Sequence, residues 1–181
     1  MRMIRFATMV AAAIAASVAV GCSPQRGHFP DDWVGSWRGE IEMPPARTAA
    51  GPVIMELAIE RTDDPDRFGW TIVYDAPDGR QVRAYELVAR NRAEGRYAID
   101  ERNGIVLEAR EFDGVLYSWF SIGGSNILVR EALLRGPDGE CIEVEFVTAL
   151  DRDTVTTGPN AEVRSLVPVS VQRAQLRRTA R

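Results

Sequence analysis

The residues that most often perform catalysis are scarce in this chain of 181 residues. His28 is its only histidine, and Cys22 and Cys141 are its two cysteines. A cysteine nucleophile or a Ser-His-Asp triad needs a histidine within hydrogen-bonding reach. His28 precedes the first predicted strand and lies in a polar segment, so neither arrangement is expected. We predict no catalytic residues.

Metal and phosphate sites are not expected either. Zinc and other transition metals are held by clusters of His, Cys and carboxylates at recognisable spacings, and the sequence contains no such pattern. The glycines of "SIGGSN", residues 121–126, mark a hairpin turn and are not followed by a helix that could bind an anion. We predict no metal and no cofactor.

Acidic residues come close together in one region. Asp100, Glu101, Glu108 and Glu111 could supply a general acid and a general base, but a glycosidase needs both carboxyls in one cavity. Asp100 lies at a predicted turn and Glu108 faces away from Leu107, so a solvated outer face explains these residues better. An enzyme with an interior cavity stays open as a third hypothesis, which a buried carboxylate in that cavity would favour.

Aromatic residues give the stronger signal. Aromatic walls suit a flat or lipidic guest, and tyrosine hydroxyls can orient it. The alternative is that the rings form an ordinary packed core. Six rings fall on strand positions that we assign to the interior and predict as pocket residues: Trp70, Tyr74, Tyr85, Tyr97, Tyr117 and Trp119.

These rings must be positioned by strands, because polar and apolar residues alternate in several segments, with Met55, Leu57 and Ile59 on one face. Turn signals rich in Gly, Asn, Asp and Pro separate the segments. Residues 44–51 and 151–163 are predicted as long loops that form the mouth of the fold or a lid over it. The predicted strands are Trp33–Met43, Val53–Arg61, Phe68–Asp75, Gln81–Arg90, Arg96–Asp100, Ile105–Glu111, Val115–Ile122, Asn126–Leu134, Cys141–Leu150 and Ser165–Leu176.

Many short strands with short connections are typical of an antiparallel barrel or sandwich. About 150 residues follow the N-terminal segment, enough for one buried domain. We predict an all-β fold, a single antiparallel up-and-down β-barrel of about ten strands over residues 32–181. A β-sandwich is the alternative.

Gly35-Ser36-Trp37, at the head of the first predicted strand, resembles the Gly-x-Trp motif of the calycins, the superfamily of lipocalins and fatty-acid-binding proteins. The resemblance implies that Trp37 plugs the closed end of a barrel while an arginine of the last strand, here Arg173, lies across its ring. A cation–π contact of this kind would join the first strand to the last and remove the free sheet edges.

The same resemblance implies a small hydrophobic ligand in the barrel. Haem-binding members of the ten-stranded calycin group use a histidine, and no predicted strand contains one, so haem is not expected. A few calycin-like barrels are cyclases, which supports keeping the catalytic hypothesis. The absence of a helix before the last predicted strand favours a ten-stranded calycin-like barrel over a classical lipocalin.

Residues 1–21 are typical of a secretory signal, with two arginines before an apolar run that is short for a membrane span. Ala19-Val20-Gly21-Cys22 resembles a bacterial lipobox, which implies that Cys22 is acylated and begins the mature protein. Cleavage without lipidation is the alternative. Residues 22–31 are then a lipidated tether.

The lipoprotein interpretation predicts a membrane contact through acyl chains. Ser23 after the cysteine favours, in the Gram-negative lipoproteins that this start resembles, the outer membrane and the periplasm. With Cys22 modified, only Cys141 remains, which we predict to be a small buried hydrophobic residue.

Charge argues against nucleic acid as a partner. All 22 basic residues are arginines, and loss of residues 1–21 leaves 20 of them against 26 acidic side chains. We therefore predict a non-catalytic, lipid-anchored envelope protein that binds or carries a small hydrophobic molecule. The alternative is a packed barrel that docks a protein partner, with a patch around Phe120 and Ile122 as the candidate surface.

Overall fold

The computed structural model describes residues 25, 26, 28–43 and 51–179. All ten predicted strands have counterparts, and Val53–Arg61, Arg96–Asp100 and Val115–Ile122 are confirmed at both ends. The first begins at Gly35 rather than at Trp33, which ends a 3₁₀ helix. The elements are β1 (Gln25–Arg26), η1 (Asp31–Trp33), β2 (Gly35–Glu42), β3 (Val53–Arg61), β4 (Arg67–Ala76), β5 (Gly79–Asn91), η3 (Arg92–Glu94), β6 (Arg96–Asp100), β7 (Val106–Phe112), β8 (Val115–Ile122), β9 (Ser125–Gly136), β10 (Gly139–Thr157) and β11 (Glu162–Arg178).

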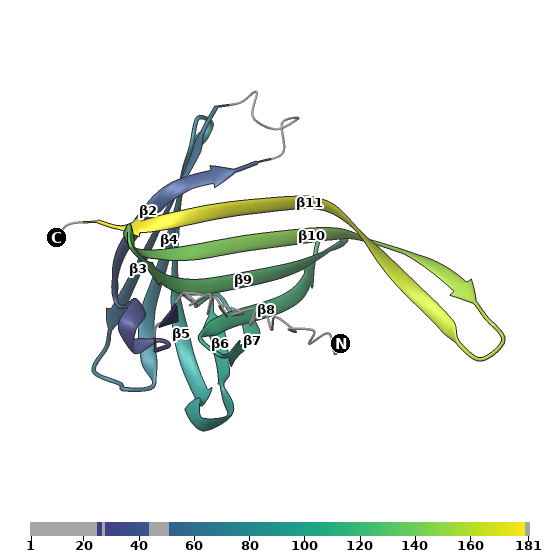
Figure 1. Ribbon diagram of the computed structural model, residues 1–181, viewed down its shortest axis with the longest axis horizontal. Helices are drawn as coiled ribbons and strands as arrows, with labels where there is room; N and C mark the ends of the chain where they lie inside the picture. Colours follow the sequence, from purple (N-terminus) through teal and green to yellow (C-terminus); the bar gives the residue numbers. More distant parts are fainter. Residues whose placement is uncertain (1–24, 27, 44–50, 180–181) are drawn as a thin grey trace, which may run out of the picture.

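Strands β2 to β11 form a closed antiparallel barrel of ten strands, in which each strand pairs with the next along the chain. The ring closes where β11 returns to β2, with Ala174 opposite Ile41 and Arg178 opposite Trp37. The predicted up-and-down barrel is confirmed, and the sandwich alternative is wrong (Figure 1). One short strand, β1, was not predicted. It pairs with the part of β9 that extends beyond the end of the β8–β9 pairing.

The two ends of the barrel differ. One end, which we call the closed end, carries η1, η3 and the β3–β4, β5–β6, β7–β8 and β9–β10 turns. The other, the open end, carries the remaining connections. The predicted loop 44–51 joins β2 to β3 there, and its residues 44–50 lie outside the described residues.

The β10–β11 hairpin is much longer than predicted. Pairing of β10 with β9 stops at Leu150 and pairing of β11 with β2 starts at Arg173, yet β10 and β11 stay paired as far as Thr157 and Glu162. The prediction of a loop at residues 151–163 is therefore wrong. These residues extend the hairpin into a two-stranded arm that projects from the barrel (Figure 1). β-Branched residues, as in "TVTT" at 154–157, favour such a strand.

The interior is packed most densely towards the closed end. Alternation sends Met55, Leu57 and Ile59 inward, and all three are buried. Full burial of each such side chain contributes about 1.5–3 kcal/mol. Cys141 is buried and free, as predicted for a small hydrophobic residue. Towards the open end the interior apolar residues are only partly covered, including Ile72 and Val129.

Candidate functional site

Four aromatic rings close the bottom of the barrel, and we call them the aromatic floor: Phe29, Trp33, Trp70 and Tyr97. The ring centre of Phe29 lies 4.8 Å from those of both Trp33 and Tyr97, edge to face. Trp70 lies 6.2 Å from Trp33. Tyr97 is thus an interior residue, as predicted, but it belongs to the packed floor and does not line the cavity described below.

The floor includes residues predicted to be tether. Phe29 and Pro30 are buried, so the last part of the predicted tether 22–31 belongs to the domain. Asp31 forms ion pairs with Arg61 at 2.7 Å and with Arg92 at 3.2 Å, which fix η1 across the end of the barrel.

Asp32, the next residue, is also held by an arginine of the barrel. Its carboxylate accepts a hydrogen bond from Arg135 on β9 at 2.8 Å and another from the backbone N–H of His28 at 2.7 Å. These two hydrogen bonds lower the pKa of Asp32, because they stabilise the ionised carboxylate. His28 therefore contributes to the fold through its backbone.

Trp37 sits at the closed end as the motif implied, but its arginine is not the predicted one. The guanidinium carbon of Arg178 lies 4.1 Å from the ring centre of Trp37. Arg178 also donates hydrogen bonds to the carbonyl of Val34 at 2.8 Å and to Glu140 at 3.0 Å.

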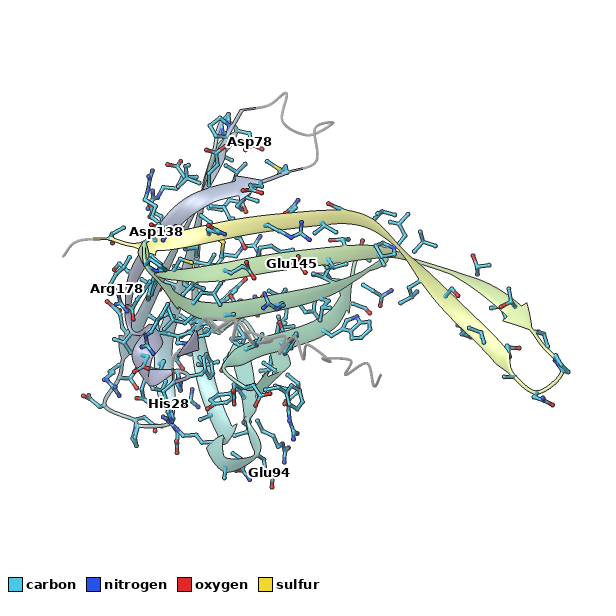
Figure 2. All side chains as sticks on the ribbon, in the orientation of Figure 1. His28, Asp78, Glu94, Asp138, Glu145 and Arg178 are labelled. Atoms are coloured by element: carbon cyan, nitrogen blue, oxygen red, sulfur yellow. The ribbon has the colours of Figure 1, made fainter. Side chains whose placement is uncertain are left out.

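The prediction that Arg173 lies across the ring of Trp37 is therefore wrong. Arg173 is exposed and pairs with Glu145 at 2.5 Å. Figure 2 shows Glu145 farther along the barrel wall than Arg178. The position of Arg173 pairs with Glu42, whereas the strand partner of Trp37 is Arg178, so register decides which arginine reaches the ring. Gly35 is suited to its place because its φ of 143° is one that side chains rarely adopt, and an added Cβ would lie 2.3 Å from Arg178.

An interior cavity of about 90 Å³ lies above the aromatic floor. Trp70 and Tyr74 of β4 and Tyr85 of β5 contribute to its wall, so three of the six predicted pocket residues meet there. Strands β8 to β10 supply the facing wall with Ser118, Phe120, Val129, Glu131 and Phe146.

Glu131 is the unexpected member of this wall. Its side chain is only 6% exposed, and among the described residues its carboxyl has no hydrogen-bond or ion-pair partner. Burial raises its pKa to about 7, because the charged form is disfavoured away from water. The inward direction of Glu131 could have been predicted from the sequence. Val129, Glu131 and Leu133 alternate along β9 and share one face, and the two apolar residues indicate that this face is turned inward.

Polar groups gather on the upper part of the cavity wall. The guanidinium carbon of Arg83 lies 5.1 Å from the ring centre of Tyr74. Burial raises the pKa of Tyr74 to about 12, and Arg83 opposes part of this rise. The pKa of Tyr85 is also raised, first by burial, and Glu101 adds to the rise by charge and hydrogen bonding.

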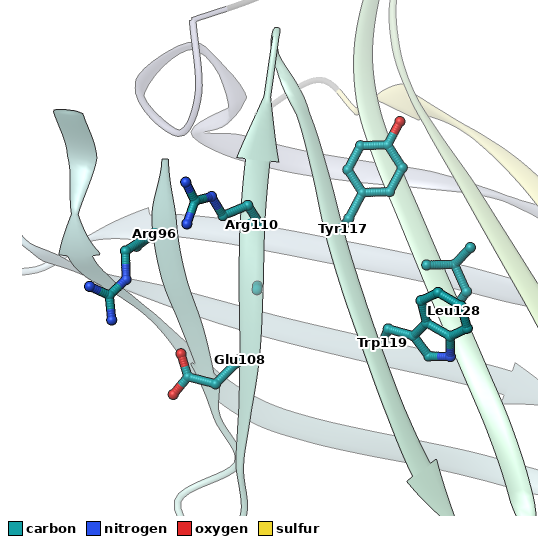
Figure 3. Close-up of a pocket in the computed structure, with 7 residues that line it drawn as sticks. Arg96, Glu108, Arg110, Tyr117, Trp119 and Leu128 are labelled. Carbon is teal, nitrogen blue, oxygen red and sulfur yellow. The ribbon is translucent and has the colours of Figure 1, made fainter. Parts of the chain in front are cut away.

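Tyr117 and Trp119 lie on the outer surface, so their predicted place in the interior pocket is wrong. In β8, Leu116, Ser118 and Phe120 take the inward phase, and Trp119 is 68% exposed. The segment is apolar on both faces, which makes its phase ambiguous from sequence. The two rings line an outer pocket of about 570 Å³ together with Arg96, Glu108, Ala109, Arg110 and Leu128 (Figure 3).

The two residues of the candidate docking patch, Phe120 and Ile122, differ in their exposure. Phe120 is half-buried and lines the interior cavity, whereas Ile122 is 58% exposed at the end of β8.

Of the acidic residues considered for catalysis, Glu108 is exposed in the outer pocket and Glu101 lines the interior one. Within residues 25–26, 28–43 and 51–179, no group of three or more His, Cys, Asp and Glu side chains could hold a metal ion.

Cys22 and residues 1–21 fall outside the described residues, so lipidation and cleavage stay predictions. Among the helices in the described part of the chain, none is long and apolar enough to cross a bilayer. Comparison of the whole chain with protein-family models and with curated proteins found no match.

Proposed function

We propose that this protein is a calycin-like barrel that holds a small, mainly apolar molecule, or the end of a longer one, in its interior. The observation that carries the proposal is the cavity above the aromatic floor, walled by Trp70, Tyr74 and Tyr85. Ring faces of this kind bury apolar surface without requiring hydrogen bonds. Partly covered residues such as Ile72 and Phe146 extend the apolar wall towards the open end.

The size of the cavity limits the guest. A volume of about 90 Å³ is equivalent to about three water molecules at their liquid density, whereas pockets for drug-sized ligands usually measure about 300–1,000 Å³. The enclosed part of the guest is therefore a short alkyl or similar group, and any longer portion would lie along the open half of the barrel.

We further propose that the barrel works at the bacterial cell envelope, tethered through acyl chains on Cys22, and that its role is to bind rather than to transform its guest. The lipobox-like sequence supports the tether. Glu131 is the residue on which the catalytic alternative depends, because a buried carboxyl with a pKa near 7 is suited to general acid–base catalysis. Conversion of a bound guest would contradict the binding role.

Native mass spectrometry tests the proposal. We expect the protein, expressed in the cell envelope of its source organism and purified as a soluble Cys22→Ser form, to carry a stoichiometric adduct. Ser118→Leu should remove the adduct, because the larger side chain enters the cavity from β8. Trp119→Ala is the matched control, one residue along the same strand on the outer surface, and should keep it. A bare mass in all three proteins would overturn the proposal.

A second candidate function is a docking module for a protein partner, and the outer pocket favours it. Trp119 and Phe112 are 68% and 56% exposed, and Arg110 stacks on Phe112 at 5.4 Å. Exposed aromatic and arginine side chains are enriched where proteins bind one another. If this function is the correct one, Trp119→Ala should weaken capture of one partner in an envelope pull-down, and Ser118→Leu should leave it unchanged.

A further inference from the structure

We propose that the interior cavity recognises a small organic cation, an alkylammonium group, through the carboxylate of Glu131 and the aromatic faces around it. The inference rests on the proposed function, because it assigns the chemical class of the guest that occupies the same cavity. It is carried by the position of Glu131, by its lack of a described partner and by the rings that surround it.

Glu131 occupies a place that a packed barrel would give to an aliphatic residue. Its neighbours on the same inward phase of β9 are Val129 and Leu133, and its strand partners are Leu116 on β8 and Val144 on β10. None of these offers a hydrogen-bond donor on its side chain. An ionised carboxylate left in such surroundings is costly, and a cationic group that enters the cavity removes the cost by pairing with it.

The remainder of the wall also suits a cation. Five aromatic side chains line the cavity with Glu131: Trp70, Tyr74, Tyr85, Phe120 and Phe146. The face of an aromatic ring carries negative charge density and attracts ammonium groups, most strongly where water is excluded. A carboxylate and five aromatic side chains that line one small cavity therefore favour an alkylammonium ion over a neutral molecule of the same size.

The other charged and titratable groups of the cavity lie on β4, β5 and the β6–β7 connection. Arg83 stacks on Tyr74, and Glu101 influences Tyr85 and accepts a hydrogen bond from Asn103 at 3.2 Å. Among the described residues of β8 and β10, those that line the cavity are Ser118, Phe120 and Phe146, none of which titrates. Glu131 is thus the acidic group of the inner wall, and Arg83 and Glu101 bring opposite charges to the rest of it.

The pairing predicts a particular dependence on pH. An alkylammonium ion keeps its charge up to about pH 10, as a lysine side chain does. Burial of Glu131 raises its pKa to about 7, so the fraction of ionised carboxylate increases steeply between about pH 6 and pH 8. Affinity for the cation should rise over this interval, and affinity for a neutral isostere should not change.

The test compares n-butylamine with 1-butanol, which have the same number of non-hydrogen atoms and differ in charge. Dissociation constants are measured by NMR titration at about pH 6 and about pH 8, for the wild type, for Glu131→Gln and for Glu108→Gln, an acidic control on the outer surface. At about pH 8 we expect the wild type and the control to bind the amine about tenfold or more tightly than the alcohol. Glu131→Gln should lose this preference.

The outcomes separate this inference from the proposed function. Equal affinities of the wild type for amine and alcohol at both pH values would overturn the cation site and leave an apolar binding barrel. Binding of neither compound would contradict both. The pH series on the wild type alone decides the matter if Glu131→Gln fails to fold: a flat affinity for the amine would overturn the inference.

Discussion

Glu131 places an ionisable carboxyl group in a largely apolar part of the barrel interior. Its side chain lies among rings and aliphatic groups, and burial alone raises its pKa to about 7. An acid whose pKa is higher in the folded protein than in the unfolded chain holds its proton more tightly when folded. Its effect on stability is therefore favourable at low pH and is lost as the pH rises through the interval between the two pKa values.

This linkage gives a prediction for stability. Between about pH 5 and pH 8 the contribution of Glu131 should lower the free energy of unfolding by about 2–3 kcal/mol, because its pKa moves from 4.5 to about 7, each unit corresponds to about 1.4 kcal/mol, and part of the total change falls below pH 5. Urea unfolding of Glu131→Gln should lack this component, because its amide stays neutral.

The exposed Glu108→Gln provides the control and should retain the full decline. If Glu131→Gln shows the same decline as the wild type, the carboxyl of Glu131 is solvated and the description of the cavity is incorrect.

The residue-level predictions from sequence succeeded where a strand alternates clearly and failed where it does not. Trp70 and Tyr74 follow apolar alternation on β4, and both line the cavity. Tyr117 and Trp119 lie in "VLYSWFSI", in which both phases are apolar, so their outward direction could not be read from the sequence.

At the scale of elements, closure of the barrel depends on the register between β11 and β2. The four pairs described between these strands lie between Glu42–Arg173 and Trp37–Arg178, and Thr179 adds a backbone hydrogen bond to Ser36 at 2.8 Å. The ring of Trp37 is thus covered by the arginine directly opposite it. Sequence predicted the contact between first and last strands, but the identity of the arginine required the register, which no local pattern supplies.

Two arginines on β11 allow this account of closure to be tested. Arg178→Met should lower the free energy of unfolding by about 1–3 kcal/mol, because it removes the cation–π contact and hydrogen bonds to buried or partly buried groups. Arg173→Met removes an exposed ion pair and should cost less than about 1 kcal/mol. Equal losses in the two variants, measured by urea unfolding, would show that Arg178 is not the closing residue.

The arm is an element whose removal the barrel should tolerate. Between Leu150 and Arg173 neither strand of the hairpin pairs with a neighbouring barrel strand, apart from its partner within the arm. Replacement of residues 150–167 by Asn-Gly, which joins the paired residues Ala149 and Pro168 through a two-residue turn, should change the free energy of unfolding by less than about 1 kcal/mol.

Loss of the cooperative transition in this shortened protein would contradict that view and would make the arm part of the core structure.

The arm was predicted as a loop because "DRDTVTTGPNAEV" is polar and contains Gly and Pro. Gly158 and Pro159 in fact lie in the turn between the two strands, and pairing of β10 with β11 orders the polar residues on either side of it.

At the scale of the whole molecule, the fold is a barrel with a packed closed half and a partly open upper half. Alternation and turn signals were sufficient to predict the all-β class, the up-and-down order and the strand count. They could not predict how far the interior is filled, because that depends on the combined volumes of side chains from ten strands.

The proposed place of the molecule in the cell depends on its first residues. We expect the full chain, expressed in a Gram-negative host with labelled palmitate, to incorporate the label. Cys22→Ser should abolish incorporation, and Cys141→Ser should not, because Cys141 is buried in the barrel. A wild type that stays unlabelled and soluble in the periplasm would contradict lipid anchoring.

Methyl NMR can locate a guest inside the barrel directly. Spectra of isoleucine- and valine-labelled protein are recorded during titration with n-butylamine and with 1-butanol. We expect shifts at the interior methyls of Ile72, Ile99 and Val129, and unchanged signals at the exposed Val106, Ile122 and Val163. Shifts confined to the exposed methyls, or no shift with either compound, would contradict a binding site inside the barrel.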